Sequence, residues 1–145
     1  MTNDQLTRNK NLVADFIQDL FGKGDLTAVD RYLAADFVNH DPPFPGSPDG
    51  AAGMRGAAER FRTALPDWRT EVEHLVAEDD LVVEHFHARG THVGELFGQP
   101  GTGRTLTLRG VQIFRIAGDR IVERWGRLDE AGLHTQLTTP WAGGD

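Results

Sequence analysis

Residues 118–137, GDRIVERWGRLDEAGLHTQL, combine a turn, a strand and a short helix in one continuous stretch. Gly118-Asp119 is a turn signal, and the alternation after it predicts a strand over residues 121–128. Strand side chains point alternately to two faces. One face therefore carries Ile121, Glu123, Trp125, Arg127 and Asp129. A face that joins several charges to a large aromatic residue fits a pocket wall, and an edge strand with an incidental tryptophan is the alternative.

Length and composition set the broad class of the protein. We expect a single domain over residues 1–145, with a loose tail from about residue 138. The net charge of −7 and the scattered basic residues predict no nucleic-acid or membrane partner. The sequence lacks a membrane-length apolar run and a signal peptide, which predicts a soluble, cytoplasmic protein. The absence of cysteine excludes disulfides, thiol catalysis and Cys-ligated zinc.

Helical patterns occupy the first part of the chain. Thr2-x-x-Gln5 has the form of a capping box, and apolar residues then recur at helical spacing until Gly22 and Gly24. A second helix is predicted after Asp25, with Leu26, Val29, Tyr32 and Leu33 as its apolar residues. Residues 37–48 are too rich in proline for a helix or a central strand and predict a loop. A third helix is predicted from about residue 49 until Pro66.

The pattern then changes from helical spacing to alternation. Four antiparallel strands are predicted over residues 69–77, 81–92, 106–116 and 121–128. Helices followed by strands indicate the α+β class. We therefore expect a cone-shaped α+β barrel, in which three N-terminal helices pack on a strongly curved antiparallel sheet and leave a ligand pocket of several hundred cubic ångströms.

Four segments carry a resemblance to a known family: FVNHDPP, RTALPDW, ARGTHVGELFGQPGTGR and DRIVERWGRLDEAGLHTQL. Their order and spacing resemble the SnoaL-like polyketide cyclases, from about residue 12 to residue 137. The resemblance implies the nuclear transport factor 2-like α+β barrel and a homodimer. It also implies a cofactor-free intramolecular aldol closure of an aromatic polyketide ester. The acid/base of that reaction is an aspartate at the end of the last strand.

Asp129 and His40 are the predicted catalytic residues. Asp129 stands at the place that matches the family's acid/base aspartate, and His40 matches the histidine of its HDP motif. In an apolar cavity, desolvation would raise the pKa of such a carboxyl toward neutral pH. The alternatives are that Asp129 caps the following helix and that His40 ties its loop to neighbouring backbone.

The other predicted pocket residues come from strand alternation, except Phe16, which belongs to the first helical pattern. We expect the substrate to contact Trp125, Gln112, Phe16, Phe86 and Glu84. Glu84 points inward with Phe86, so it must pair with an inner cation, unless the strand register is shifted by one residue. Gln112 is expected on the inner face of its strand as a neutral hydrogen-bonding group, and a polar residue at a strand end is the alternative.

The opposite sheet face is expected to carry His85 and His87. H-x-H is a familiar metal pairing, but a third ligand would have to come from His74, His92 or a carboxylate across the sheet. The glycine-rich segment 98–103 lacks the GK[ST] of a phosphate loop. We therefore expect no metal and no cofactor, and a homodimer formed through this mixed face.

These observations predict an enzyme that performs acid/base chemistry on a hydrophobic, carbonyl-bearing, polyketide-like small molecule. Isomerisation, dehydration and epoxide hydrolysis are alternative reactions for the same pocket. Two non-enzymatic alternatives are a protein that only binds a small apolar ligand and a dimerisation domain whose barrel is filled.

Overall fold

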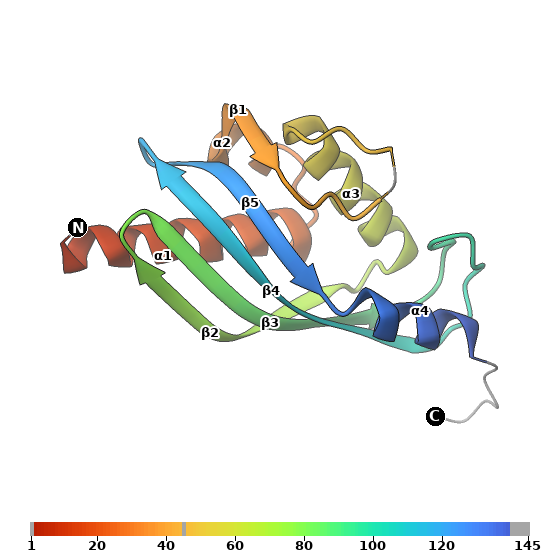
Figure 1. The fold of residues 1–145 in the computed structure, drawn as a ribbon. Helices are drawn as coiled ribbons and strands as arrows, with labels where there is room; N and C mark the ends of the chain where they lie inside the picture. The colour runs from red at the N-terminus through yellow and green to blue at the C-terminus, as the bar shows by residue number, and fades with distance from the viewer. Residues whose placement is uncertain (1, 45, 140–145) are drawn as a thin grey trace.

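Helices cover one face of a curved sheet in the computed structural model, which describes residues 2–44 and 46–139 (Figure 1). The helical elements are α1 (Asn3–Ile17), the π-helix η1 (Gln18–Gly22), α2 (Ala28–Tyr32), α3 (Ala51–Ala64) and α4 (Glu130–Thr138). The strands are β1 (Leu33–Asn39), β2 (Arg69–Glu78), β3 (Leu81–Thr91), β4 (Thr105–Ala117) and β5 (Arg120–Leu128). The α+β class and the curled, helix-covered sheet are confirmed.

The sheet has five strands, in the order β1-β5-β4-β3-β2, instead of the four that alternation predicted. The additional strand β1 pairs in parallel with β5, whereas the other neighbours are antiparallel. The sequence pattern predicts a helix at its first residue, Leu33, and a loop over residues 37–39, and both predictions are wrong for β1. Three residue pairs define its irregular register with β5. Its short sequence LAADFVN shows no clean alternation of apolar and polar residues, and the pattern therefore does not indicate a strand.

Two groups of buried apolar side chains fill the space between helices and sheet. One surrounds α1 and η1, where Val13, Phe16 and Leu20 are fully buried, and the other lies between α3 and the far end of the sheet. The N-terminus of α1 is capped as predicted, because Thr2 Oγ1 accepts a hydrogen bond of 3.1 Å from Gln5 N. No helix in the described part of the chain is long and apolar enough to cross a membrane.

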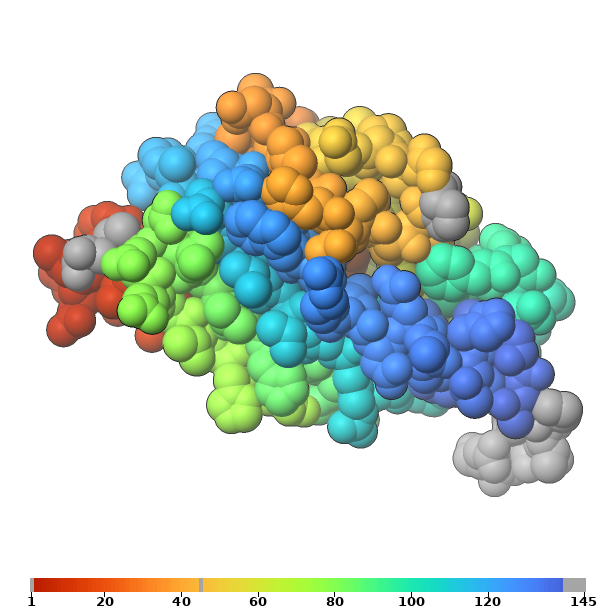
Figure 2. Space-filling model, in the orientation of Figure 1, coloured from red at the N-terminus to blue at the C-terminus, as the bar shows by residue number. Residues whose placement is uncertain are grey.

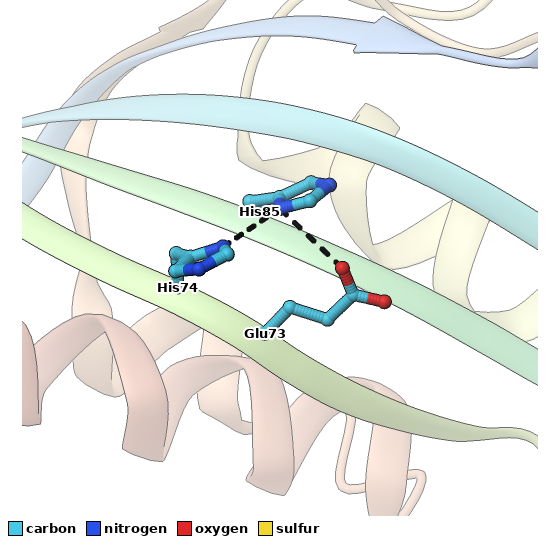
Figure 3. Close-up of side chains that lie close together, drawn as sticks. All are labelled: Glu73, His74 and His85. Carbon is cyan, nitrogen blue, oxygen red and sulfur yellow. Dashed lines mark hydrogen bonds and ion pairs between the residues drawn. The ribbon is translucent and has the colours of Figure 1, made fainter.

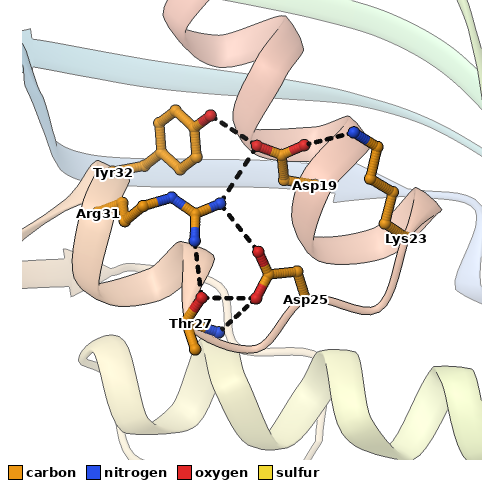
Figure 4. A network of polar contacts seen from close by, with 6 residues as sticks. All are labelled: Asp19, Lys23, Asp25, Thr27, Arg31 and Tyr32. Atoms are coloured by element: carbon orange, nitrogen blue, oxygen red, sulfur yellow. Dashed lines mark hydrogen bonds and ion pairs between the residues drawn. The ribbon is translucent and has the colours of Figure 1, made fainter.

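A polar network holds the corner between α1 and α2 (Figure 4). Asp19 in the π-helix accepts a 2.7 Å hydrogen bond from the hydroxyl of Tyr32 and lies 3.3 Å from Arg31. The same guanidinium reaches Asp25 at 3.0 Å. Exposed ion pairs contribute little to stability, but several sharing one arginine fix the direction of the short helix. That direction leads the chain into β1 at the edge of the sheet.

A β-bulge in β5 determines which of its side chains point inward. Arg115 pairs with Glu123 and Ile116 pairs with Ile121, so Val122 has no partner on β4. An extra residue in one strand reverses the alternation beyond it. Ile121 therefore faces the helices, whereas Glu123 faces away from them.

The predicted common face of β5 is consequently wrong. Beyond the bulge, Arg124, Gly126 and Leu128 face the helices, and Trp125 and Arg127 lie on the outer face with Glu123. On β3 and β4, which pair without a register shift, the alternation predicted the faces correctly. The buried residues Val82, Glu84, Phe86 and Ala88 of β3 point inward, as do Leu106, Leu108, Gln112 and Phe114 of β4. Figure 2 views the outer face, where residues of the central strands lie uncovered by the helices.

Candidate functional site

Four polar side chains, one from each of four neighbouring strands, are buried on the inner face of the sheet. Gln112 Nε2 donates a hydrogen bond of 2.8 Å to Glu84 Oε1. Arg124 Nε donates to Gln112 Oε1 over 2.6 Å, and its Nη1 donates to Asn39 Oδ1 over 3.0 Å. The four side chains form one hydrogen-bonded row from β3 to β1.

Burial strongly perturbs both ionisable members of this row. Desolvation raises the pKa of Glu84 to about 7, although the hydrogen bond from Gln112 and the charge of Arg124 act in the opposite direction. Desolvation lowers the pKa of Arg124 to about 10, against the attraction of Asp41 and Glu84. Arg124 therefore stays charged at neutral pH, where Glu84 changes its protonation state. The row can supply both a fixed cation and an exchangeable proton.

One oxygen of Glu84 stands apart from the row. Its Oε2 is buried and has no hydrogen-bond partner within residues 2–44 and 46–139. A buried polar atom without a partner costs about 1–3 kcal/mol and calls for a functional or structural reason. Together with the perturbed pKa, this oxygen marks Glu84 as a candidate functional residue.

The row borders a mostly apolar cavity between the sheet and α3. Gln112, Arg124 and Asn39 supply its polar wall, and Phe61, Trp68 and Phe86 are among the apolar residues around it. Its volume is about 50 Å³. The predicted pocket of several hundred cubic ångströms is therefore wrong for this conformation, because aromatic side chains from α3, the loop after it and β3 occupy most of the cone.

The loop after β1 is fastened to β5 by Asp41. Its Oδ2 accepts hydrogen bonds of 2.9 Å from Gly126 N and from Arg127 Nη1, and its backbone oxygen accepts one of 3.0 Å from Arg124. The hydrogen bond from Gly126 N is the main reason why the pKa of the Asp41 carboxyl lies below its ordinary value. Asp41 thus positions the loop and the buried guanidinium together.

His40 and Trp125 lie on the outer face of the sheet. The two rings are stacked, with centroids 4.9 Å apart, and His40 Nε2 is 2.9 Å from Glu123 Oε2. Trp125 borders an outer hollow instead of the inner cavity, so its predicted place in the pocket wall is wrong. The reason is the bulge at Val122, which turns the following residues over.

Asp129 stands at the N-terminus of α4, exposed to solvent. Its Oδ1 accepts a hydrogen bond of 2.9 Å from Gly132 N, which is the helix-capping arrangement named above as the alternative. No contact between Asp129 and His40 is found in the described part of the chain, and neither borders the inner cavity. Their catalytic roles remain predictions, and the structure does not place the two side chains together at the cavity.

The two predicted phenylalanines occupy different places. Phe86 borders the cavity. Phe16 is fully buried against Tyr32 and Phe114 in the core beneath α1, away from the cavity lining. Sequence reasoning missed Arg124 and Asn39. Both lie on segments, a bulged strand and an irregular edge strand, where alternation does not indicate the direction of a side chain.

A curled sheet covered by helices, with a small cavity that has a polar wall, defines the α+β class of this protein. The sequence pattern of the SnoaL-like polyketide cyclases matches residues 11–137, and the chain belongs to this family. Among curated relatives, the aklanonic acid methyl ester cyclase DauD of Streptomyces sp. (strain C5) is 28% identical over 116 residues. That match covers 74% of this chain and 71% of DauD.

Solved structures agree with the family assignment. TsrD from Streptomyces laurentii superposes with a TM-score of 0.81 at 27% identity, covering 92% of this chain and 97% of TsrD. IdmH from Streptomyces antibioticus gives a TM-score of 0.75 at 31% identity, covering 89% and 97% of the two chains. The chain is therefore similar in fold and length to these proteins.

Proposed function

We propose that the protein catalyses a cofactor-free, intramolecular aldol cyclisation of a hydrophobic, carbonyl-bearing, polyketide-like molecule at the inner cavity. The observation that carries this proposal is a mostly apolar cavity with Gln112 and Arg124 in its wall and with Glu84 hydrogen-bonded to Gln112. The relative DauD supports the substrate class, because it is an aklanonic acid methyl ester cyclase.

The reaction needs a base, a proton donor and a stabiliser for an enolate. A base removes a proton alpha to a carbonyl, the resulting enolate carbon attacks a second carbonyl carbon of the same molecule, and the new alkoxide takes up a proton. The product is an isomer of the substrate, so no oxidant, reductant or co-reactant is consumed. Arg124, charged and buried, would stabilise the enolate oxygen, and Gln112 would add a second polar contact.

We assign the acid/base role to Glu84, which lies outside the cavity lining but is hydrogen-bonded to the lining residue Gln112. Its pKa of about 7 suits a group that must accept and return a proton near neutral pH. The resemblance instead assigns this role to Asp129, assisted by His40. Asp129 and His40 lie outside the cavity lining as well, and the two assignments predict different mutants to be inactive.

The cavity must enlarge to admit such a substrate, since small-molecule sites usually measure about 300–1,000 Å³. The wall that is not part of the sheet includes Met54 and Phe61 of α3 and Pro43 of the preceding loop. Displacement of this wall would open the cone while the hydrogen-bonded strands keep the polar row in place. Binding of substrate is therefore proposed to move α3 or its side chains.

Turnover of aklanonic acid methyl ester, followed by chromatography of the cyclised isomer, tests the proposal. Glu84→Gln should lower the rate by about 10²- to 10⁴-fold, the usual contribution of general acid–base catalysis. Asp129→Asn and His40→Asn should retain activity. Loss of activity in Asp129→Asn alone would support the assignment from the resemblance. If the wild type is inactive but the ester raises its melting temperature, the protein binds such ligands without converting them.

We also infer that the protein forms a homodimer through the outer sheet face. Four side chains make an apolar row across the antiparallel strands, namely Val76, Val83, Ile113 and Trp125. Their alignment is set by strand register and crosses a face that the helices leave uncovered (Figure 2). A second copy of the same face would cover this row through an isologous contact.

A further inference from the structure

A second β-bulge gathers metal-binding groups on the outer face of the sheet. In β2, Val72 pairs with Phe86 and His74 pairs with His85, so Glu73 is an extra residue without its own partner. Two consecutive residues of β2 therefore lie opposite one residue of β3. Figure 3 shows the result, with the side chains of Glu73 and His74 both directed toward His85.

The donor atoms are already close together. Nδ1 of His74 lies 3.0 Å from Nδ1 of His85, and the two rings are stacked with an interplanar angle of 2°. His85 Nδ1 is 3.5 Å from Glu73 Oε2, and one donor atom from each of the three residues lies within 4.8 Å of the others. Ligands bound to zinc at about 2.0–2.2 Å in a tetrahedral arrangement are roughly 3.3–3.5 Å apart. Small side-chain rotations would therefore complete three coordination positions.

The 3.0 Å contact between the facing nitrogens also restricts where their hydrogens lie. If both Nδ1 atoms carried a hydrogen, the two N–H groups would point at each other and no hydrogen bond could form. At least one of the two Nδ1 atoms therefore carries no hydrogen and directs its lone pair at the other ring. A divalent cation placed between the rings and the Glu73 carboxylate would replace this contact with bonds to neutral imidazole nitrogens.

We propose that Glu73, His74 and His85 form a site for a divalent transition metal, with Zn²⁺ as its probe. Two imidazoles and one carboxylate are a common zinc ligand set, and the exposed position leaves a fourth place for water. The site differs from the H-x-H pairing considered from sequence, because its second histidine is His74 across the strands instead of His87. It departs from the expectation that no metal binds.

His87 acts as a positioning residue for this site. Its Nδ1 lies 2.8 Å from Oε1 of Glu73, and its Nε2 lies 3.2 Å from Glu71 Oε2. Hydrogen bonds to a coordinating carboxylate orient it toward the metal and strengthen binding. Glu73 can therefore use one oxygen for His87 and the other for the cation.

The site is separate from the proposed catalytic cavity. His85 is an outer-face residue of β3, whereas its neighbours Glu84 and Phe86 point to the inner face. The residue paired with His85 on β4 is Val111, whose side chain has no competing donor. Metal binding and the activity of the cavity can consequently be tested independently.

Isothermal titration of Zn²⁺ into the full chain, purified without a histidine tag, tests the proposal. We expect one Zn²⁺ per chain and, with Co²⁺ as a substitute, the visible absorption of a tetrahedral complex. His74→Ala and His85→Ala should each weaken Zn²⁺ binding at least tenfold, because even loss of an orienting partner costs about 10- to 100-fold. His87→Gln should weaken binding while leaving the stoichiometry unchanged.

His134→Ala is the matched control, because this exposed histidine lies on α4 away from β2. It should bind Zn²⁺ as the wild type does. Circular dichroism establishes that each variant is folded. The proposal is overturned if the wild type takes up no Zn²⁺, or if His74→Ala and His85→Ala bind it as tightly. Equal weakening by His134→Ala would overturn it as well.

Discussion

The carboxyl group of Glu84 is buried, and burial disfavours its charged form. The stability of the fold therefore depends on pH. Its pKa is about 7 in the folded protein and 4.5 in its ordinary state. A raised pKa means that the folded protein holds this proton more tightly than the unfolded chain does. The stabilisation is therefore complete below pH 4.5 and is lost as the pH rises through about 7.

Glu84→Gln should remove this pH dependence. The amide keeps an acceptor for Gln112 but carries no charge, so the variant should gain stability relative to the wild type between pH 5 and pH 8. The gain should be about 3 kcal/mol at most, since one pKa unit corresponds to about 1.4 kcal/mol. Urea unfolding followed by circular dichroism at both pH values measures it. Glu78→Gln, on the exposed surface, should show no such gain, and an equal gain there would contradict the role of burial.

Single residues also show how far the sequence alone could lead to the site. Alternation placed Glu84, Phe86 and Gln112 on the inner face, because β3 and β4 pair without a register shift. It failed for Arg124 and Trp125, because one unpaired residue at Val122 exchanges the two faces. The inner cation that Glu84 required was anticipated, but its identity depended on a bulge that no local sequence signal marks.

At the scale of single elements, α4 provides a test of what Asp129 does for the fold. The helix buries Leu133 and Leu137 against the core, and Asp129 caps its N-terminus through Gly132 N. Asp129→Ala should lower the free energy of unfolding by about 1 kcal/mol, whereas Asn caps nearly as well as Asp. Chemical unfolding of both variants measures the difference. If Ala and Asn behave alike, the hydrogen bond to Gly132 does not stabilise the helix.

The helices were easier to predict than the edge of the sheet. Long amphipathic segments such as α1 and α3 bury one continuous stripe, so their spacing carries a strong signal. In contrast, β1 is stabilised by its tertiary pairing with β5 and follows directly on α2. The predicted loose tail lies mostly outside the described residues, although α4 extends to Thr138. The prediction of a single domain stays untested.

At the scale of the whole molecule, the two faces of the sheet carry different groups of side chains. The inner face carries the polar row and the cavity, and the outer face carries the apolar row and the proposed metal site. Strand alternation allows both, because neighbouring residues such as Glu84 and His85 serve opposite faces. A bulge on each of two strands then adjusts the pattern, one bringing Arg124 inward and the other bringing Glu73 beside His74.

The proposed homodimer can be tested with a single substitution on the outer face of the sheet. Val76, at one end of the apolar row, is 58% exposed, so lysine at this position should leave the single chain folded. In a dimer related by a twofold axis the substitution occurs twice, and each lysine would have to give up water beside apolar side chains. Val76→Lys should weaken self-association at least tenfold, as measured by sedimentation equilibrium. Val93→Lys, at a residue 55% exposed and outside the named strands, is the matched control and should associate as the wild type does. A wild type that stays monomeric at high micromolar concentration, or a Val76→Lys variant that associates as strongly, would show that this face does not join two copies.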